Sequence, residues 1–152
     1  MGKTSWYELI VIKAEEKDIS DIYQIGTVSF SDAWREETIR NDMKGEHSCY
    51  FIAKIAKKVI GYGCFWFIAD EAQLMNIGVL PEYRRMGAAE KILKQGLEEA
   101  AERHMEVIFL EVRVSNLPAQ SLYRKYNFQT VSVRQDVYEL PRENGYIMSR
   151  KV

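Results

Sequence analysis

The sequence predicts a mixed α/β (α+β) fold, with about seven strands in one sheet and four helices. Three observations lead to this prediction. Apolar and aromatic runs of strand length recur along the chain, two of them form a hairpin-like pair, and amphipathic segments of helical period separate the others. Long antiparallel stretches combined with helical crossovers are typical of such a sheet. At 152 residues the chain has the length of one domain, so we expect a single domain over residues 1–152.

The N-terminal half is expected to form one strand, two helices and a hairpin, over residues 7–13, 17–30, 35–43, 49–55 and 59–68. Apolar residues at helical spacing predict the first helix. Ser31 and Asp32 break that pattern, and both are residue types that cap the start of a second helix. Lys57 and Lys58 separate two apolar, aromatic-rich runs, which favours a turn between paired strands.

The C-terminal half is expected to alternate strands with helices and to end in two strands. The strands are expected at 73–79, 107–112, 130–136 and 145–151. One helix is expected to begin after Ala89, and a shorter one to cover 117–126. Pro81 ends the first strand, because proline cannot donate to the hydrogen-bond ladder. Ile92, Leu93 and Leu97 lie on one face of the longer helix, which marks its buried side.

Composition excludes several classes of function. The 21 basic and 22 acidic residues give no basic excess for a nucleic-acid or membrane partner. Two cysteines without CxxC spacing and two histidines predict neither a disulfide framework nor a metal site. The apolar runs are too short to cross a bilayer, and the first ten residues lack a signal pattern. We therefore expect a cytoplasmic protein in a reduced compartment.

The most informative segment is NIGVLPEYRRMGAA, residues 76–89, in which a strand leads through a basic loop into a helix. Unpaired N–H groups and a partial positive charge at a helix start favour phosphate binding. Small residues after the two arginines would let a pyrophosphate approach the backbone. The segment is neither a Walker loop nor a GxGxxG fingerprint. On spacing alone, a surface loop with solvated arginines remains an open alternative.

The loop RRMGAA also matches the acetyl-CoA signature Q/R-x-x-G-x-G/A, and its neighbours extend the match. Downstream of the loop stand FLEVRVSN at 109–116 and A-x-x-L-Y-x-x-x-x-F at 119–128. Upstream of it stands FSDAW at 30–34. The tail contains R-x-x-x-Y at 134–138 and ENGYIM at 143–148. From about residue 7 to residue 150 the chain resembles the GNAT superfamily of N-acetyltransferases, and within it the RimI-like N-terminal (ribosomal-protein-alanine) acetyltransferases.

This resemblance implies a seven-stranded GNAT sheet whose fourth and fifth strands splay into a V-shaped cleft for the co-substrate acetyl-CoA. Backbone groups of Ile77, Gly78 and Val79 would bind the pantetheine arm. The pyrophosphate would lie on the loop formed by Arg84, Arg85, Met86, Gly87, Ala88 and Ala89. Asn116 has two interpretations: it contacts the cofactor, or it caps the last helix, with Pro118 in the first turn.

Two residues are candidates for the chemistry of acetyl transfer. Glu111 interrupts an apolar strand, and partial burial raises a carboxylate pKa toward the range of a useful general base. The alternative is an ion pair with Arg113 or another cation. The resemblance places Tyr123 as general acid and as a contact of the cofactor, whereas its position in a helical apolar stripe equally suits a core residue.

The acceptor side is less defined by the sequence. Trp34, Glu71 and Tyr138 are candidate substrate-binding residues, although each also fits ordinary packing or a solvated position. The tail departs from the family pattern at Val137 and at Asn144-Gly145, near the expected peptide end of the cleft. The expected acceptor is a protein N-terminal α-amine. The alternatives are a small-molecule amine, a lysine side chain, or a non-catalytic acyl-CoA-binding module. We expect a monomer or weak homodimer.

Overall fold

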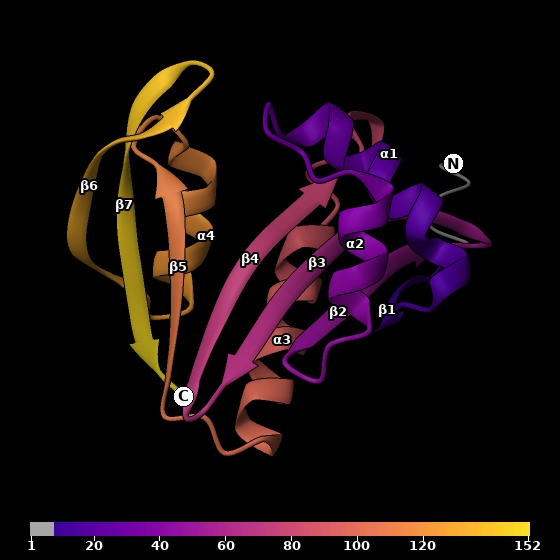
Figure 1. Ribbon diagram of the computed structural model, residues 1–152, viewed down its shortest axis with the longest axis horizontal. Coiled ribbons are helices and arrows are strands. Elements are labelled where there is room, and N and C mark those ends of the chain that lie inside the picture. Colours follow the sequence, from indigo (N-terminus) through magenta and orange to yellow (C-terminus); the bar gives the residue numbers. More distant parts are fainter. Residues whose placement is uncertain (1–7) are drawn as a thin grey trace.

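The computed structural model describes residues 8–152, so the first residue of the strand expected at 7–13 lies outside the described residues. The described chain forms seven strands, four α-helices and two short 3-10 turns (Figure 1). Their order is β1 Leu9–Lys13, α1 Ile19–Ser29, α2 Glu36–Met43, β2 Ser48–Ile55, β3 Lys58–Ile68, β4 Glu71–Val79, α3 Ala88–Glu102, β5 Val107–Arg113, α4 Leu117–Lys125, β6 Gln129–Glu139 and β7 Arg142–Lys151. The fold class expected from the sequence is confirmed.

All seven strands belong to one mixed sheet with the order β1-β2-β3-β4-β5-β7-β6. Neighbouring strands pair antiparallel, with one exception: β4 and β5 are parallel, because helix α3 carries the chain back between them. Over residues 8–152, no helix is long and apolar enough to cross a bilayer.

Helices cover both faces of the sheet and bury two separate cores. Helix α3 packs on the face that presents Phe51, Phe65 and Leu74, and the apolar stripe of α4 joins the same core. Helices α1 and α2 pack on the other face, where Tyr62 and Cys64 are buried. The alternation of side chains along β2 and β3 explains both cores, because successive residues of a strand point to opposite faces.

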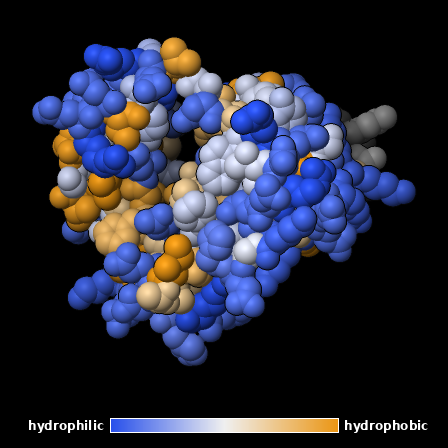
Figure 2. All heavy atoms as spheres, in the orientation of Figure 1, coloured by the Kyte–Doolittle hydropathy of each residue, from blue (hydrophilic) through white to orange (hydrophobic). Residues whose placement is uncertain are grey.

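The sheet opens between its two central strands. β4 and β5 pair only from Glu71–Val107 to Leu74–Leu110, and both strands continue beyond that point. The β3–β4 register shifts at the same place, so that Met75 is an extra residue in β4. Such a bulge bends its strand, so β4 turns away from β5. Figure 1 shows the resulting V, and Figure 2 shows a hollow at its open end. The cleft implied by the resemblance is therefore present.

The two final strands are longer than the periodicity predicts. β6 reaches from Gln129 to Glu139 and β7 begins at Arg142, so their hairpin extends well beyond the expected ends. β6 is an edge strand with most of its side chains exposed, so it lacks the apolar alternation that marks a half-buried strand. The hairpin tip, residues 139–142, contains a cis Leu140–Pro141 bond and lies at the open end of the cleft.

Candidate active site

The end of β4 forms one wall of the cleft. Ile77, Gly78 and Val79 pair with β3 along one edge only, since β5 has already separated. Alternate residues of a strand direct their N–H and C=O groups to opposite edges, so part of this backbone faces the gap. Helix α1 presses on the same segment: a Cβ added at Gly78 would lie 3.0 Å from Ser29 Oγ. A larger residue at this position would have to displace α1 or the Ser29 side chain by a few tenths of an ångström.

The basic loop leads from this wall directly into helix α3. Arg84 Nε donates to the carbonyl oxygen of Val79 at 3.0 Å, which ties the loop to the end of β4. Arg85 and Gly87 adopt left-handed conformations with φ of 66° and 85°, and Gly87 is the N-cap residue before Ala88. A Cβ at Gly87 would meet no atom within 4 Å, so the space above the helix start is open. The loop therefore has the geometry of an anion site.

The two candidate catalytic residues lie on opposite sides of the sheet. Ile108, Leu110 and Val112 of β5 point into the core beneath α3 and α4, so Glu111, between them, points to the other face. Tyr123 comes from α4 and packs on the α3-side core. Only a gap in the sheet lets groups on its two faces act on one bond, and this is where β4 and β5 separate.

Glu111 is held by an ion pair. Its Oε2 accepts a hydrogen bond from Arg134 Nη1 at 3.1 Å, and 27% of the Glu111 side chain is exposed. This is the pairing that the sequence left open as an alternative to a catalytic role, with Arg134 rather than Arg113 as partner. The ion pair with Arg134 involves one carboxylate oxygen, and the carboxylate stays partly exposed to solvent. Both roles of Glu111 therefore remain compatible with the geometry.

Tyr123 packs against the core of the α3 side. Its ring lies 5.8 Å from that of Phe128, as expected of a core residue. Burial raises the pKa of the Tyr123 phenol above its ordinary value, and the nearby Tyr138 raises it further. The phenol therefore stays protonated at neutral pH.

Asn127, which follows the helix of Tyr123, has φ of 70°. It takes the left-handed position at the helix end that glycine usually occupies.

Tyr138 lies beside Glu111 on the acceptor face. Burial raises the pKa of Tyr138 to about 12, and the Glu111 carboxylate contributes to the shift. Gly145 of β7 makes this approach possible: a Cβ there would lie 3.0 Å from Tyr138 Cε2 and 3.2 Å from Glu111 Cγ. The departure from the family pattern at Asn144-Gly145 thus coincides with the point where the two side chains meet.

The remaining candidates are dispersed. Asn116 caps α4, because its Oδ1 accepts a hydrogen bond from the backbone N–H of Ala119 at 3.2 Å, which confirms the capping interpretation. Trp34 follows α1, and its ring packs 6.1 Å from that of Trp66 on β3. Glu71 pairs in register with Val107, at the closed end of the V. The structure therefore does not bring Glu71 to the other site residues.

One buried polar cluster was not predicted from the sequence. Asp42 of α2 accepts hydrogen bonds from Tyr50 Oη at 2.8 Å and Trp66 Nε1 at 3.1 Å, and its other carboxylate oxygen lies 3.2 Å from His47 Nε2. Only 9% of the Asp42 side chain is exposed. Its residues come from separate elements of the fold, so no local spacing in the sequence predicts it.

Among residues 8–152, no group of three or more His, Cys, Asp or Glu side chains could hold a metal ion.

Comparison with known proteins identifies the class to which this fold and cleft belong. The sequence profile described as the Acetyltransferase (GNAT) family matches residues 17–128. This span contains the open edge of β4, the basic loop, β5 and α4. The chain therefore belongs to the GNAT family of acetyltransferases and is an N-acetyltransferase.

Within that family the chain is similar to the RimI-like enzymes. It is 31% identical over 145 residues to the ribosomal protein bS18-alanine N-acetyltransferase of Haemophilus influenzae, covering 92% of this chain and 97% of that one. The crystal structure of the ribosomal-protein-S18-alanine N-acetyltransferase from Escherichia coli superposes with a TM-score of 0.88, at 28% identity over 95% and 94% of the two chains. Arabidopsis thaliana NAA60, solved in complex with acetyl-CoA, has the same fold at 16% identity, covering 95% of this chain and 99% of that one with a TM-score of 0.85.

Proposed function

We propose that this enzyme transfers the acetyl group of acetyl-CoA to the N-terminal α-amine of a protein, and that the acceptor is the N-terminal alanine of ribosomal protein bS18. The observation that carries the proposal is the similarity, over nearly the full length of both chains, to relatives named for that reaction. The cleft supports it, because a basic loop leads into the start of α3 at one side, and Glu111 lies on β5 beyond the point where β4 and β5 separate, with Tyr138 beside it.

The α3 side of the cleft suits acetyl-CoA. The first N–H groups of α3 have no partner within the helix, and the loop that precedes them carries Arg84 and Arg85. A pocket beside Gly87 is lined by Lys91 and Lys94 and also by Glu8 and Glu90, so the positive charge of this side comes from the loop and the helix start. We assign the pyrophosphate to this loop and the pantetheine arm to the open backbone edge of Ile77–Val79. The thioester would then lie in the gap between β4 and β5.

The chemistry follows from the groups around that gap. An α-amine has a pKa near roughly 8, so only modest assistance is needed to deprotonate it at neutral pH. Glu111 takes the amine proton, directly or through a water molecule, as the nitrogen bonds to the thioester carbon. Tyr123 donates its proton to the sulfur as the C–S bond breaks. The products are an acetylated amine and CoA, and Tyr138 positions the acceptor backbone beside Glu111.

A panel of acceptors tests this function. Peptides that begin with alanine should be acetylated with a kcat/KM at least about tenfold above that of the same peptides with a blocked N-terminus and an internal lysine. Spermidine serves as the small-amine control, and CoA release is measured in each reaction. Turnover of spermidine alone would contradict a protein acceptor. Tight acetyl-CoA binding without any turnover would favour the non-catalytic acyl-CoA-binding alternative.

The loop assignment predicts the effect of changing Gly87. Gly87→Val should raise the KM for acetyl-CoA about tenfold, because a β-branched residue is strained at φ of 85° and its side chain occupies the open space above the helix start. Gly87→Asn is the matched control, since asparagine tolerates the left-handed conformation, and its KM should rise less. The KM for the acceptor peptide should change little in both variants. An unchanged acetyl-CoA KM in Gly87→Val would remove the loop from the binding site.

A further inference from the structure

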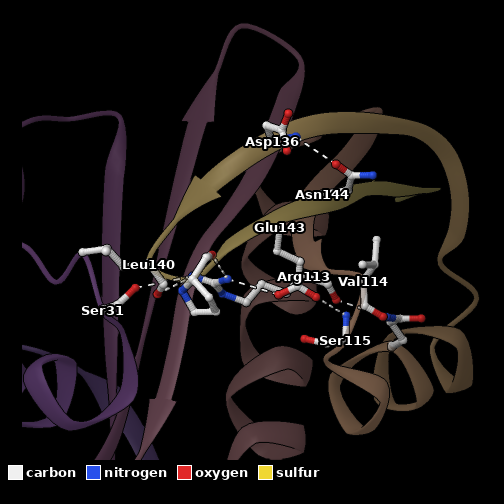
Figure 3. Close-up of polar contacts among 10 residues, drawn as sticks. Ser31, Arg113, Val114, Ser115, Asp136, Leu140, Glu143 and Asn144 are labelled. Carbon is white, nitrogen blue, oxygen red and sulfur yellow. Dashed lines mark hydrogen bonds and ion pairs between the residues drawn. The ribbon is translucent and has the colours of Figure 1, made fainter.

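The end of β5 carries an arginine whose side chain reaches into the β6–β7 hairpin. Arg113 Nη1 donates to the carbonyl oxygen of Pro141 at 2.9 Å and to Glu143 Oε1 at 3.1 Å. Nη2 donates to the carbonyl oxygen of Leu140 at 3.1 Å (Figure 3). Only 23% of the Arg113 side chain is exposed. The tip of the hairpin is thus organised around one guanidinium group, which satisfies two consecutive backbone carbonyls.

The same guanidinium contacts the tyrosine of the acceptor side. The Arg113 guanidinium carbon lies 4.3 Å from the centre of the Tyr138 ring, so the cation stacks on the aromatic face. Tyr138 is therefore held between Arg113 and Gly145, in the place where it meets Glu111.

Arg113 also reaches across the open end of the cleft. Its Nη2 lies 3.4 Å from Ser31 Oγ, in the segment that joins α1 to α2. Helix α1 packs on β3 and β4, so Ser31 belongs to the N-terminal half of the sheet, whereas Arg113 belongs to the C-terminal half. One side chain therefore bridges the two halves at the end where β4 and β5 have separated.

Glu143 extends this arrangement to the start of α4. Its second carboxylate oxygen accepts a hydrogen bond from the backbone N–H of Ser115 at 2.7 Å, and only 14% of its side chain is exposed. The backbone N–H of Val114 donates to the carbonyl oxygen of Asn144 at 3.2 Å. Asn144 Oδ1 in turn accepts from the backbone N–H of Asp136 at 2.8 Å. The hairpin is thereby anchored to the corner that leads into the helix of Tyr123.

We propose that Arg113 is a positioning residue for the acceptor: it clasps the β6–β7 hairpin to the Ser31 segment and holds Tyr138 beside Glu111. This proposal rests on the proposed function for the identity of the acceptor but not for the contacts themselves. Arg113 touches no reacting atom in this arrangement. It acts through Tyr138 and through the shape of the open end of the cleft.

The arrangement requires arginine rather than any cation. The planar guanidinium donates to Leu140, Pro141, Glu143 and Ser31 while its face stacks on Tyr138. A lysine ammonium has three donors and no planar face, so it would keep the charge and lose most of these contacts. From the sequence alone, Arg113 has one candidate role, as a partner of Glu111. The structure pairs Glu111 with Arg134 instead and leaves Arg113 to the hairpin.

Steady-state kinetics of Arg113→Lys and Arg113→Gln test the clasp. In both variants the KM for the acceptor peptide should rise about tenfold, while the KM for acetyl-CoA stays within about twofold, because the hairpin contributes to the acceptor side alone. Arg142→Gln is the matched control, since Arg142 is an exposed arginine of the same hairpin, and both KM values should stay at the wild-type level. Equal losses in both KM values, with a lowered melting temperature, would show a merely structural role and overturn the proposal.

Hydrogen exchange gives a readout that does not depend on turnover. Amides of residues 138–144 and of the segment around Ser31 should exchange about tenfold faster in Arg113→Gln than in the wild type, whereas amides of α3 should not change. Unchanged exchange in both segments would overturn the clasp. If the wild-type enzyme prefers a different acceptor, the proposed function fails, while the exchange experiment and the KM of that acceptor still decide the role of Arg113.

Discussion

Glu111→Gln should lower kcat for acetyl transfer by at least about 100-fold, because the amide cannot accept the proton of the attacking amine. Its KM for acetyl-CoA should stay near the wild-type value, since Glu111 lies on the opposite face of β5 from α3. The residual rate should rise with pH up to roughly pH 8, as more of the α-amine becomes neutral without assistance. Glu106→Gln, at an exposed position just before β5, is the control and should leave the rate unchanged.

Tyr123→Phe is the partner experiment for the proton on the sulfur. Removal of the hydroxyl should lower kcat by about 100-fold, while the ring still packs on Phe128 and the melting temperature is preserved. Tyr126→Phe, at the C-cap of the same helix, is a matched control: the Tyr126 hydroxyl donates to Glu90 Oε2 at 2.5 Å. This control should keep most of the activity. Full activity in both Glu111→Gln and Tyr123→Phe would show that transfer proceeds without this pair.

Local patterns in the sequence were sufficient to locate the elements of the fold. Helical spacing predicts the buried stripe of α3, and the strand–loop–helix motif of residues 76–89 is contiguous, so its geometry follows from neighbouring residues. The separation of β4 and β5 came from the family resemblance instead. The bulge at Met75 that bends β4 leaves no mark in the alternation of apolar residues, because its cause is the register with β3.

The acceptor side could not be predicted to the same depth. Arg113 meets Ser31 from 82 positions away in the chain, and Glu111 meets Arg134 from 23 positions away. Which arginine pairs with which carboxylate depends on the β5–β7–β6 register, and no spacing rule supplies that register. Glu71 begins a strand that reaches the site, but the direction of β4 places it at the closed end of the cleft, which depends on the sheet topology and not on local spacing.

The Asp42 cluster predicts the largest loss of stability. Asp42→Ala would leave Tyr50 Oη and Trp66 Nε1 without their acceptor in a buried region, and it would remove the partner of His47. The free energy of unfolding should fall by about 3 kcal/mol, because a buried donor without a partner destabilises the folded state by the full cost of removing it from water. For a chain of this length the melting temperature should drop by about 9 °C, measured by circular dichroism or calorimetry.

Two further variants show whether the loss of stability comes from the hydrogen bonds of Asp42. Asp42→Asn keeps an acceptor oxygen but loses the charge, so its stability should lie between those of the wild type and Asp42→Ala. Asp21→Ala, at an exposed aspartate of α1, should change the free energy of unfolding by less than about 1 kcal/mol. Because Trp66 also packs against Trp34, Asp42→Ala should shift the tryptophan fluorescence of the folded protein. A fully stable Asp42→Ala protein would mean that water replaces the carboxylate and that the cluster contributes little to the free energy of unfolding.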